Sequence, residues 1–204
     1  MKKIVVAWIV CILGLVGIFG WLGAPKPAEN HAESGLITGE FSLVGAEGET
    51  FADRDFHGSY TLIFFGFTHC PGICPTTLLL MQNTLDHLGD AGKKIQPIFI
   101  SIDPERDTPE ITAQYASRFG RTIGLSGSPE QIKAAADSFK VYYTKVPMEE
   151  HAGHGEHAGH DMGDYMMDHS GYLFLMGPDG RYLTHFPSSI TEQALEEGLK
   201  KFIR

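Results

Sequence analysis

The sequence predicts an α/β fold for residues 35–204, with a central mixed sheet flanked by helices on both faces. Two runs, 60–67 (YTLIFFGF) and 95–102 (IQPIFISI), are continuously apolar and rich in aromatic and β-branched residues. Such runs are typical of strands that are buried on both faces. A segment with helical spacing follows each run, and residues 171–186 (GYLFLMGPDGRYLTHF) have the pattern of a hairpin turning at GPDG. Alternating strands and helices followed by a hairpin indicate a mixed sheet.

Residues 1–24 are predicted to form an N-terminal transmembrane anchor. Within them, residues 4–24 carry no charge and no proline, and a helix of this length spans about 30 Å, the thickness of a bilayer's hydrocarbon core. Lys2 and Lys3 precede the run, so the positive-inside bias predicts a single-pass protein of the inner (cytoplasmic) membrane, with its N-terminus in the cytoplasm and its C-terminal domain in the periplasm. A signal peptide cleaved just before Pro25 is the alternative. Proline at that position should hinder cleavage, and the run is longer than a usual signal core.

A polar linker, residues 25–34 (PKPAENHAES), separates this anchor from the domain at 35–204. The formal net charge is −9, and the chain contains no cluster of basic residues. This composition argues against nucleic acid as a partner.

The first half of the domain is predicted from its turns and its helical spacing. Residues 39–51 indicate two short strands around a Gly-rich turn, which form an N-terminal hairpin extension before the buried strand at 60–67. A helix is expected from Pro75 to about Leu88, because apolar residues recur at helical spacing and proline suits a first turn.

The second half follows the same signals. After the strand at 95–102, residues 107–120 have a helix-start signature, with Asp107 or Thr108 as the cap and Pro109 in the first turn. The elements expected beyond it are a short strand at 122–127, a helix at 128–139 capped by Ser128, a strand at 141–146, the hairpin at 171–186 and an amphipathic helix at 191–203.

The segment 64–77 (FFGFTHCPGICPTT) carries two of the three cysteines, Cys70 and Cys74, at the junction of a buried strand and the following helix. In α/β folds, functional groups gather at this end of the strands. A spacing of four places both side chains on one face of a helix, and the positive end of that helix favours thiolate. Thiol–disulfide exchange, a structural disulfide and metal binding all remain open. A bridge across so short a loop stabilises little, and the three intervening residues favour metal binding modestly over dithiol exchange.

Two thiolates need a third donor to hold a metal, and soft sulfur with one imidazole suits Cu(I) or Cu(II). Among the candidate histidines, His69 adjoins Cys70, but its backbone should direct it elsewhere. His169 immediately precedes an apolar strand, so it can be fixed to the sheet while its side chain faces the cysteine loop. His185 and the four histidines of the segment described next are the other candidates. An ordinary polar residue at a strand entry explains His169 equally well.

Residues 148–168 are predicted to be a His/Met-rich surface loop, because glycines and a glutamate make a packed core unlikely. Clustered imidazoles and thioethers there form a possible secondary metal site for copper or zinc. A solvated loop that binds metal only incidentally is the alternative. The histidines concerned are His151, His154, His157 and His160.

The segment DPERDTP (103–109) follows the second buried strand, so its loop should lie near the cysteine loop. An Asp-Pro turn before a capped helix explains Asp107 and Pro109. Asp103 and Arg106 remain open, either as residues that order the metal loop or as contacts to a partner.

Three blocks, GFTHCPGICPTT, SIDPERDTPEI and DYMMDHSGYLFLMGPDG, occur in this order. Together they resemble the Sco (SenC/PrrC) family of thioredoxin-like, membrane-anchored copper proteins, over roughly residues 35–204. The resemblance implies a thioredoxin-like fold, with Cys70, Cys74 and His169 as copper ligands. The chain departs from many relatives at Gly72, where they carry an aspartate or another polar residue, and in its long His-rich segment.

The resemblance also implies a function. It predicts a non-enzymatic copper chaperone that delivers Cu(I) or Cu(II) to the dinuclear copper centre of cytochrome c oxidase subunit II during assembly. The alternative is an enzyme, a thiol–disulfide oxidoreductase in which Cys70 and Cys74 are catalytic and reduce the cysteines of that target. A copper-dependent redox sensor using the same ligands is a third possibility.

Overall fold

The computed structural model describes residues 37–147 and 165–203. Within these residues no helix is long and apolar enough to cross a membrane. The predicted anchor at 1–24, the linker at 25–34 and the four clustered histidines lie outside the described part of the chain.

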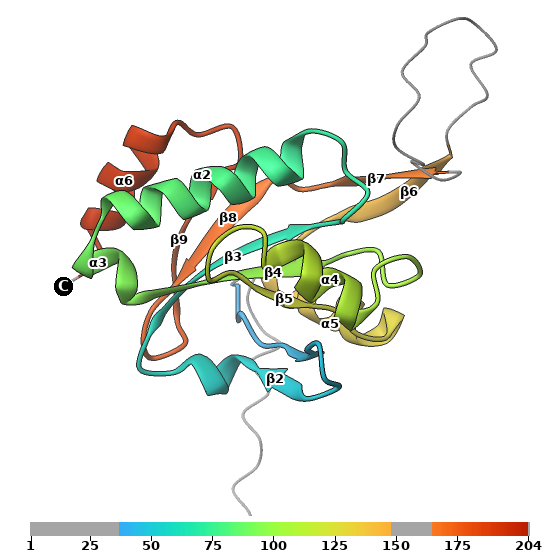
Figure 1. The fold of residues 1–204 in the computed structure, drawn as a ribbon. Coiled ribbons are helices and arrows are strands. Elements are labelled where there is room, and N and C mark those ends of the chain that lie inside the picture. The colour runs from blue at the N-terminus through green and yellow to red at the C-terminus, as the bar shows by residue number, and fades with distance from the viewer. Residues whose placement is uncertain (1–36, 148–164, 204) are drawn as a thin grey trace, which may run out of the picture. The chain divides into compact units, whose positions relative to one another are not determined.

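A five-stranded mixed sheet forms the centre of the domain, as predicted (Figure 1). The two continuously apolar runs are neighbouring parallel strands in its middle, where both faces are covered. The hairpin adds two antiparallel strands on one side. In spatial order the strands are β5 (Ile123–Leu125), β4 (Ile95–Ser101), β3 (Tyr60–Gly66), β8 (Tyr172–Met176) and β9 (Tyr182–Pro187).

Helices cover both faces of this sheet (Figure 1). The helices α2 (Ile73–His87) and α6 (Glu192–Lys200) pack together on one face, and α4 (Pro109–Ala116) and α5 (Pro129–Phe139) lie on the other. The hydroxyls of the residues that precede α4, α5 and α6 accept hydrogen bonds from backbone N–H groups of the first turn, which satisfies donors that a helix leaves unpaired. These caps are Thr108, Ser128 and Thr191.

Several predicted boundaries shift in the structure. The helix α2 begins at Ile73 rather than at Pro75, so Cys74 belongs to its first turn. The helix α4 ends at Ala116, four residues before the predicted end. A short helix, α3 (Asp90–Lys93), follows α2 and was not predicted, because four residues are too few to show helical periodicity.

Two small antiparallel sheets complete the fold. The strands β1 (Ser42–Val44) and β2 (Thr50–Ala52) form the predicted N-terminal hairpin extension, followed by the 3-10 turn η1 (Asp53–Phe56). The strands β6 (Tyr143–Pro147) and β7 (Tyr165–His169) form the second. The prediction that the loop extends to residue 168 is wrong, because its last four residues belong to β7. The pairing of β7 with β6 is a long-range contact that the local composition does not show.

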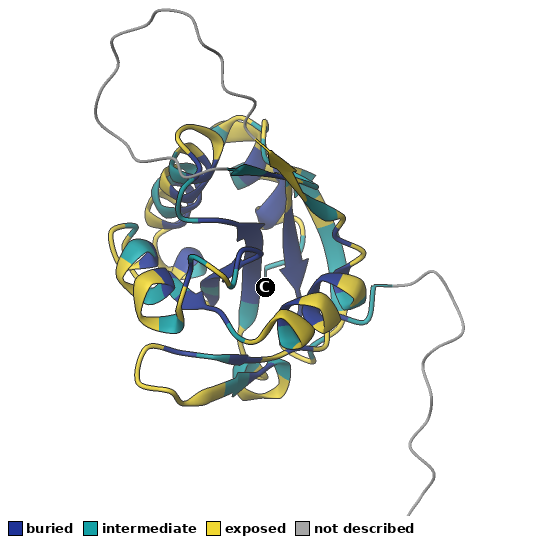
Figure 2. Ribbon diagram, turned by 90° about the vertical axis from the view of Figure 1, so that its right-hand side faces the viewer, coloured by how far each residue is buried: buried dark blue, intermediate teal, exposed yellow. Residues whose placement is uncertain are grey.

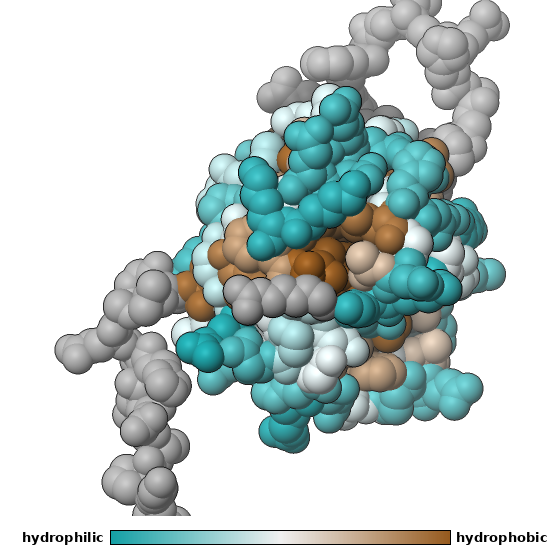
Figure 3. Space-filling model, turned by 90° about the vertical axis from the view of Figure 1, so that its left-hand side faces the viewer, coloured by the Kyte–Doolittle hydropathy of each residue, from teal (hydrophilic) through white to brown (hydrophobic). Residues whose placement is uncertain are grey.

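The core lies between the sheet and its helices. Both Phe64 and Phe65 are fully buried although they point to opposite faces of β3, as expected for a strand covered on both sides. Seen from the right of Figure 1, buried strands occupy the interior and the exposed residues lie on the outer surfaces of the helices (Figure 2). The opposite side has a largely hydrophilic surface around an apolar centre (Figure 3).

Candidate functional site

The cysteine pair lies where β3 ends and α2 begins. The side chain of Cys74 is fully buried in the first turn of α2, and that of Cys70 is 8% exposed in the preceding loop. Both are free thiols. A Cβ atom at Gly66, the last residue of β3, would lie 2.8 Å from the Cys74 sulfur. Only glycine at this position lets the helix approach the strand so closely.

At neutral pH the cysteine pair holds one proton, because the pKa of Cys70 is lowered and that of Cys74 is raised. A hydrogen bond from the Cys74 thiol lowers the pKa of Cys70 to about 5, against the opposing effect of burial. Backbone hydrogen bonds from residues 72–74, at the beginning of α2, lower it further. The same bond to Cys70, together with burial, raises the pKa of Cys74. Cys70 is therefore the thiolate and the slightly more exposed of the two buried cysteines, and Cys74 is its protonated partner, in agreement with the predicted effect of the helix end.

A buried carboxylate, Asp107, orders the cysteine loop. It accepts hydrogen bonds from the Thr68 backbone N–H at 2.8 Å and from the Ser101 hydroxyl at 2.6 Å, and also from the Thr68 hydroxyl. His69 Nδ1 lies 3.5 Å from the same carboxylate. The prediction that Asp107 is only a turn or capping residue is wrong, since Thr108 is the cap of α4 and Asp107 joins two loops that are distant in sequence. Nothing in the local sequence distinguishes these roles.

His169 is the last residue of β7 and pairs with Tyr143 on β6. Its ring packs edge-on against Phe64 and Phe67, with centroid distances of 6.2 Å to each. The Nδ1 atom lies 3.1 Å from the Ser170 carbonyl oxygen. Because a carbonyl only accepts, this bond places a proton on Nδ1 and leaves the Nε2 lone pair available for a metal.

Phe67 is the link between His169 and the cysteines. Its ring contacts the imidazole, its carbonyl accepts the Cys70 backbone N–H at 3.3 Å, and its own backbone hydrogen bonds to Cys74. Among the residues that the structure describes, no three His, Cys, Asp or Glu side chains lie close enough together to hold a metal ion. The structure thus brings Cys70 and Cys74 together and places His169 against the ring of Phe67, whose backbone bonds to both cysteines, outside coordinating geometry.

The other described candidate histidines have different surroundings. His69 faces Asp107, consistent with the expectation that it points away from the cysteine pair. His185 lies on the edge strand β9, where its ring packs against Tyr172 and hydrogen bonds to the Tyr182 hydroxyl.

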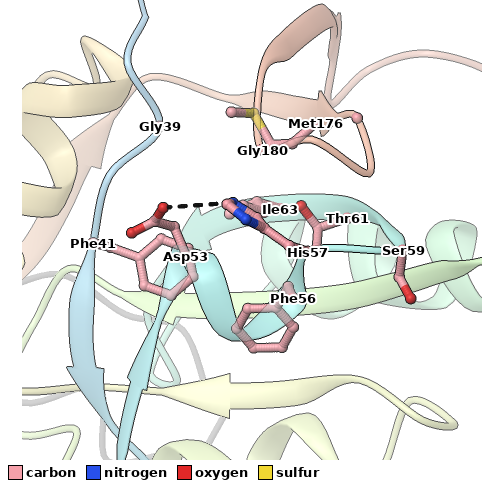
Figure 4. A pocket seen from close by; sticks show the side chains of 11 residues that line it. Gly39, Phe41, Asp53, Phe56, His57, Ser59, Thr61, Ile63, Met176 and Gly180 are labelled. Atoms are coloured by element: carbon pink, nitrogen blue, oxygen red, sulfur yellow. Dashed lines mark ion pairs between the residues drawn. The ribbon is translucent and has the colours of Figure 1, made fainter.

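A pocket lies toward the amino-terminal end of β3, where Asp53 and His57 form an ion pair across 4.0 Å (Figure 4). Residues of β3, of η1 and of the turn between β8 and β9 line it. Neither cysteine nor His169 is among the lining residues. This pocket is therefore separate from the candidate metal centre.

A family profile and individual relatives both assign the chain to the same family. The SCO1/SenC family profile matches residues 29–204. A SCO2-like protein of Rickettsia felis is 39% identical over 165 residues, which are 80% of this chain and 76% of the relative. The mitochondrial SCO1 homolog 1 of Arabidopsis thaliana is 36% identical over 175 residues, which are 85% of this chain and 49% of the relative. The chain thus spans about half of the plant protein's length.

Solved structures share the fold. Arabidopsis thaliana ScoI with copper bound is 36% identical, with a TM-score of 0.71 over 81% of this chain and 96% of that one. Bradyrhizobium japonicum ScoI with copper bound is 39% identical, with a TM-score of 0.68 over 82% and 99%. BsSco, a member of the Sco family of cytochrome c oxidase assembly proteins in which a disulfide switch was identified, shares the fold at 22% identity and a TM-score of 0.56 over 81% and 92%. The thioredoxin-like fold expected from the sequence is confirmed, and the chain belongs to the SCO1/SenC family.

Proposed function

We propose that this protein carries one copper ion on Cys70, Cys74 and His169 and delivers it to the dinuclear copper centre of cytochrome c oxidase subunit II during assembly. The observation that carries the proposal is the pair of free cysteines at the start of α2, with His169 packed on Phe67, whose backbone bonds to both cysteines. Relatives solved with copper bound align with four-fifths of this chain, which supports copper as the cargo.

The chemistry of the pair suits this cargo. Cys70 supplies a thiolate at neutral pH, and copper would displace the remaining proton from Cys74, since a thiol must be deprotonated to ligate a metal. Thiolates are soft ligands that select copper, and an imidazole nitrogen completes a three-donor set. Loading would draw His169 Nε2 away from the aromatic rings and toward the sulfurs.

We also propose that residues 4–24 anchor the protein in the inner membrane, with the domain in the periplasm. A tether on the membrane that holds the acceptor would raise the effective concentration of donor and acceptor for each other. Ligand exchange between the Cys70–Cys74 pair and the acceptor's own thiol and imidazole ligands would then transfer the copper ion without releasing it into solution.

A thiol–disulfide oxidoreductase is the second candidate, favoured by the unequal pKa values of the two cysteines. The Cys70 thiolate would attack a partner disulfide and release one partner thiolate, which takes up a proton. Cys74, after losing its proton, would then attack the mixed disulfide, which releases the second partner thiol and leaves a Cys70–Cys74 disulfide. The disulfide switch of BsSco supports redox-active cysteines in a protein of the same fold. An external dithiol would have to restore the reduced form. A copper-dependent redox sensor would use the same ligands with no delivery step.

Two parallel assays on one acceptor separate the first two candidates. The copper-loaded chain is mixed with the copper-free, reduced copper domain of an oxidase subunit II, and the copper-free reduced chain with the same domain in its disulfide form. The proposal expects stoichiometric copper transfer in the first assay. Disulfide reduction without copper transfer would assign the enzyme function instead.

The variant His169→Ala sharpens this comparison. Removing the imidazole should weaken Cu(I) and Cu(II) binding by at least about tenfold, the effect that outer-shell changes already have on metal sites. Dithiol reductase activity should be nearly unchanged, because the cysteines and α2 remain intact. Competition with a copper chelator measures the affinity, and wild-type affinity in this variant would remove His169 from the ligand set.

A further inference from the structure

We infer that Asp103, Arg106 and Tyr165 form a latch that fixes the β6–β7 hairpin to the loop after β4 and thereby positions His169 for the cysteine pair. The inference rests on the proposed function, because it concerns how His169 becomes a copper ligand. It also assigns a role to Asp103 and Arg106, which the sequence left open.

The hairpin that ends in His169 is not part of the main sheet. The strands β6 and β7 hydrogen bond to each other as a separate two-stranded sheet. Side chains of this hairpin do contact the main sheet, since the His169 ring packs on Phe64 of β3, but among the described strands β6 and β7 share no backbone ladder with it. Only Ser170 and Gly171 connect β7 to β8, which restrains the His169 end of the hairpin. The Tyr165 end depends on side-chain contacts, because no ladder of backbone hydrogen bonds ties the hairpin to β3 or β8.

The latch closes on Tyr165, the first residue of β7. The Tyr165 hydroxyl donates to Asp103 Oδ1 at 2.7 Å, and Arg106 Nη1 donates to the Tyr165 carbonyl oxygen at 3.0 Å. The Arg106 guanidinium carbon lies 3.8 Å from the centroid of the Tyr165 ring. Tyr165 is thus held through its hydroxyl, its carbonyl oxygen and the face of its ring, and β7 is held with it.

Charge and burial keep the latch together. Asp103 is fully buried, and its second oxygen accepts from Arg106 Nε at 2.5 Å. A buried carboxylate requires such a partner, and the planar guanidinium can donate to two acceptors while it stacks on a ring. Burial first, and then the bond to Asp103, raises the pKa of Tyr165 to about 12, so its hydroxyl remains a donor at neutral pH. A more exposed pair, Lys145 with Glu105, joins the same hairpin to the same loop and contributes less.

The register of β7 connects the latch to the ligand. Successive side chains of a strand alternate between its faces, so Tyr165, Met167 and His169 share one face. Met167 is 7% exposed, which identifies that face as the one turned toward the core. Fixing Tyr165 therefore fixes the side of the strand on which the His169 imidazole emerges.

Phe67 connects the same group to the metal loop. The Arg106 guanidinium carbon lies 5.9 Å from the centroid of the Phe67 ring, against which the His169 ring also packs. The backbone of Phe67 hydrogen bonds to both cysteines. Phe67 thus contacts both the latch and the cysteine pair. Because the latch already holds the hairpin against Phe67, copper binding by His169 loses less conformational entropy.

The test compares Tyr165→Phe and Arg106→Lys with wild type in the full chain in detergent, using copper alone as the probe. Tyr165→Phe removes only the hydroxyl, and Arg106→Lys keeps a charge for Asp103 but loses the planar double donor. Each should weaken Cu(II) binding about tenfold, the effect of one hydrogen bond to a charged group. With His151, His154, His157 and His160 replaced by serine in every protein compared, nitrogen hyperfine structure in the Cu(II) electron paramagnetic resonance spectrum, the signature of a bound imidazole, should fall in parallel. Tyr182→Phe, which removes a tyrosine hydroxyl bonded to His185 on β9, is the matched control and should bind like wild type.

A double-mutant cycle shows whether the effect passes through His169. In a His169→Ala background, Tyr165→Phe should cause no further loss of affinity. Unchanged or tighter binding by both latch variants, or an equal loss with and without His169, would overturn the inference.

The apo protein allows a test without copper. Amide hydrogen exchange in β6 and β7 should be faster in Tyr165→Phe than in wild type, and the rate of Cys70 alkylation should be unchanged.

Failure of the proposed function can be distinguished from failure of the latch. If wild type itself did not bind copper through its cysteines, as judged against Cys70→Ser with Cys74→Ser, the function would fail while the exchange experiment still tested the latch. Normal wild-type binding with wild-type-like latch variants would overturn the latch alone.

Discussion

At the scale of single residues, the two cysteines are chemically different although they lie only four positions apart. Cys70 lies before α2, where it receives hydrogen bonds from the helix's first N–H groups and from the Cys74 thiol. Cys74 is inside the helix and fully buried. The spacing in the sequence indicates a reactive pair, but it does not indicate which member carries the charge, because burial and hydrogen bonding decide this.

The pH dependence of alkylation tests this difference. With its pKa lowered to about 5, Cys70 in the apo protein should react with iodoacetamide at a nearly constant rate above about pH 6 and progressively more slowly as the pH falls through about 5. Cys74, with its raised pKa, should react slowly throughout. Because the bond from Cys74 is the largest cause of the lowered pKa, Cys74→Ala should move the Cys70 midpoint upward. A midpoint near the ordinary thiol value in the wild-type protein would contradict this assignment.

Gly66, at the end of β3, lies close to the first turn of α2. A Cβ atom there would lie 2.8 Å from the Cys74 sulfur and 2.9 Å from Phe99 Cε2. Gly66→Ala should therefore lower the free energy of unfolding by about 1–3 kcal/mol, the usual effect of overpacking a core. Chemical denaturation measures the change, with Gly72→Ala as control, since a Cβ atom at Gly72 meets nothing within 4 Å. A smaller loss for Gly66→Ala than for the control would contradict the packing argument.

At the scale of elements, the apolar runs, helix caps and hairpin turn were enough to predict the main sheet and its helices. Burial on both faces made β3 and β4 recognisable. Ser128 is the cap of α5 as predicted, and Thr108 is the cap of α4, where the sequence left Asp107 and Thr108 open. The strand β7 escaped prediction because its partner, β6, lies on the far side of the His-rich segment. The latch escaped for the same reason: Tyr165 meets Asp103 across 62 positions of sequence.

The junction of two loops at Asp107 provides a test at this scale. Its carboxylate ties the loop after β3 to the loop after β4 through three hydrogen bonds. Asp107→Asn replaces one accepting oxygen with a donor, so at least one buried partner loses its acceptor. The free energy of unfolding should fall by about 1–3 kcal/mol, as measured by urea denaturation.

Asp90→Asn is the matched control for that substitution. Asp90 is an exposed carboxylate paired with Lys93 on α3, so the same change there should alter stability by less than about 0.5 kcal/mol. Equal effects at the two positions would show that Asp107 does not hold the loops together.

At the scale of the whole molecule, the sequence predicts two kinds of metal ligand with different origins. The cysteine pair depends on the fold, because β3, α2 and the Asp107 network bring the sulfurs together. The four clustered histidines depend on composition alone, and they lie outside the residues that the structure describes. We therefore expect the two sets to respond differently when the fold is lost.

Copper stoichiometry distinguishes the two sets. Replacing His151, His154, His157 and His160 together by serine keeps the chain length and should reduce copper bound at saturation to one ion per chain, held by the cysteine site. The complementary variant, Cys70→Ser with Cys74→Ser, should lose the tightly bound ion and retain the weaker histidine-bound copper. That weaker binding should survive in urea, because clustered imidazoles need no folded framework, whereas the cysteine site should lose its affinity as α2 unfolds. If the histidine-to-serine variant bound as much copper as wild type, the histidine segment would have no role as a secondary site.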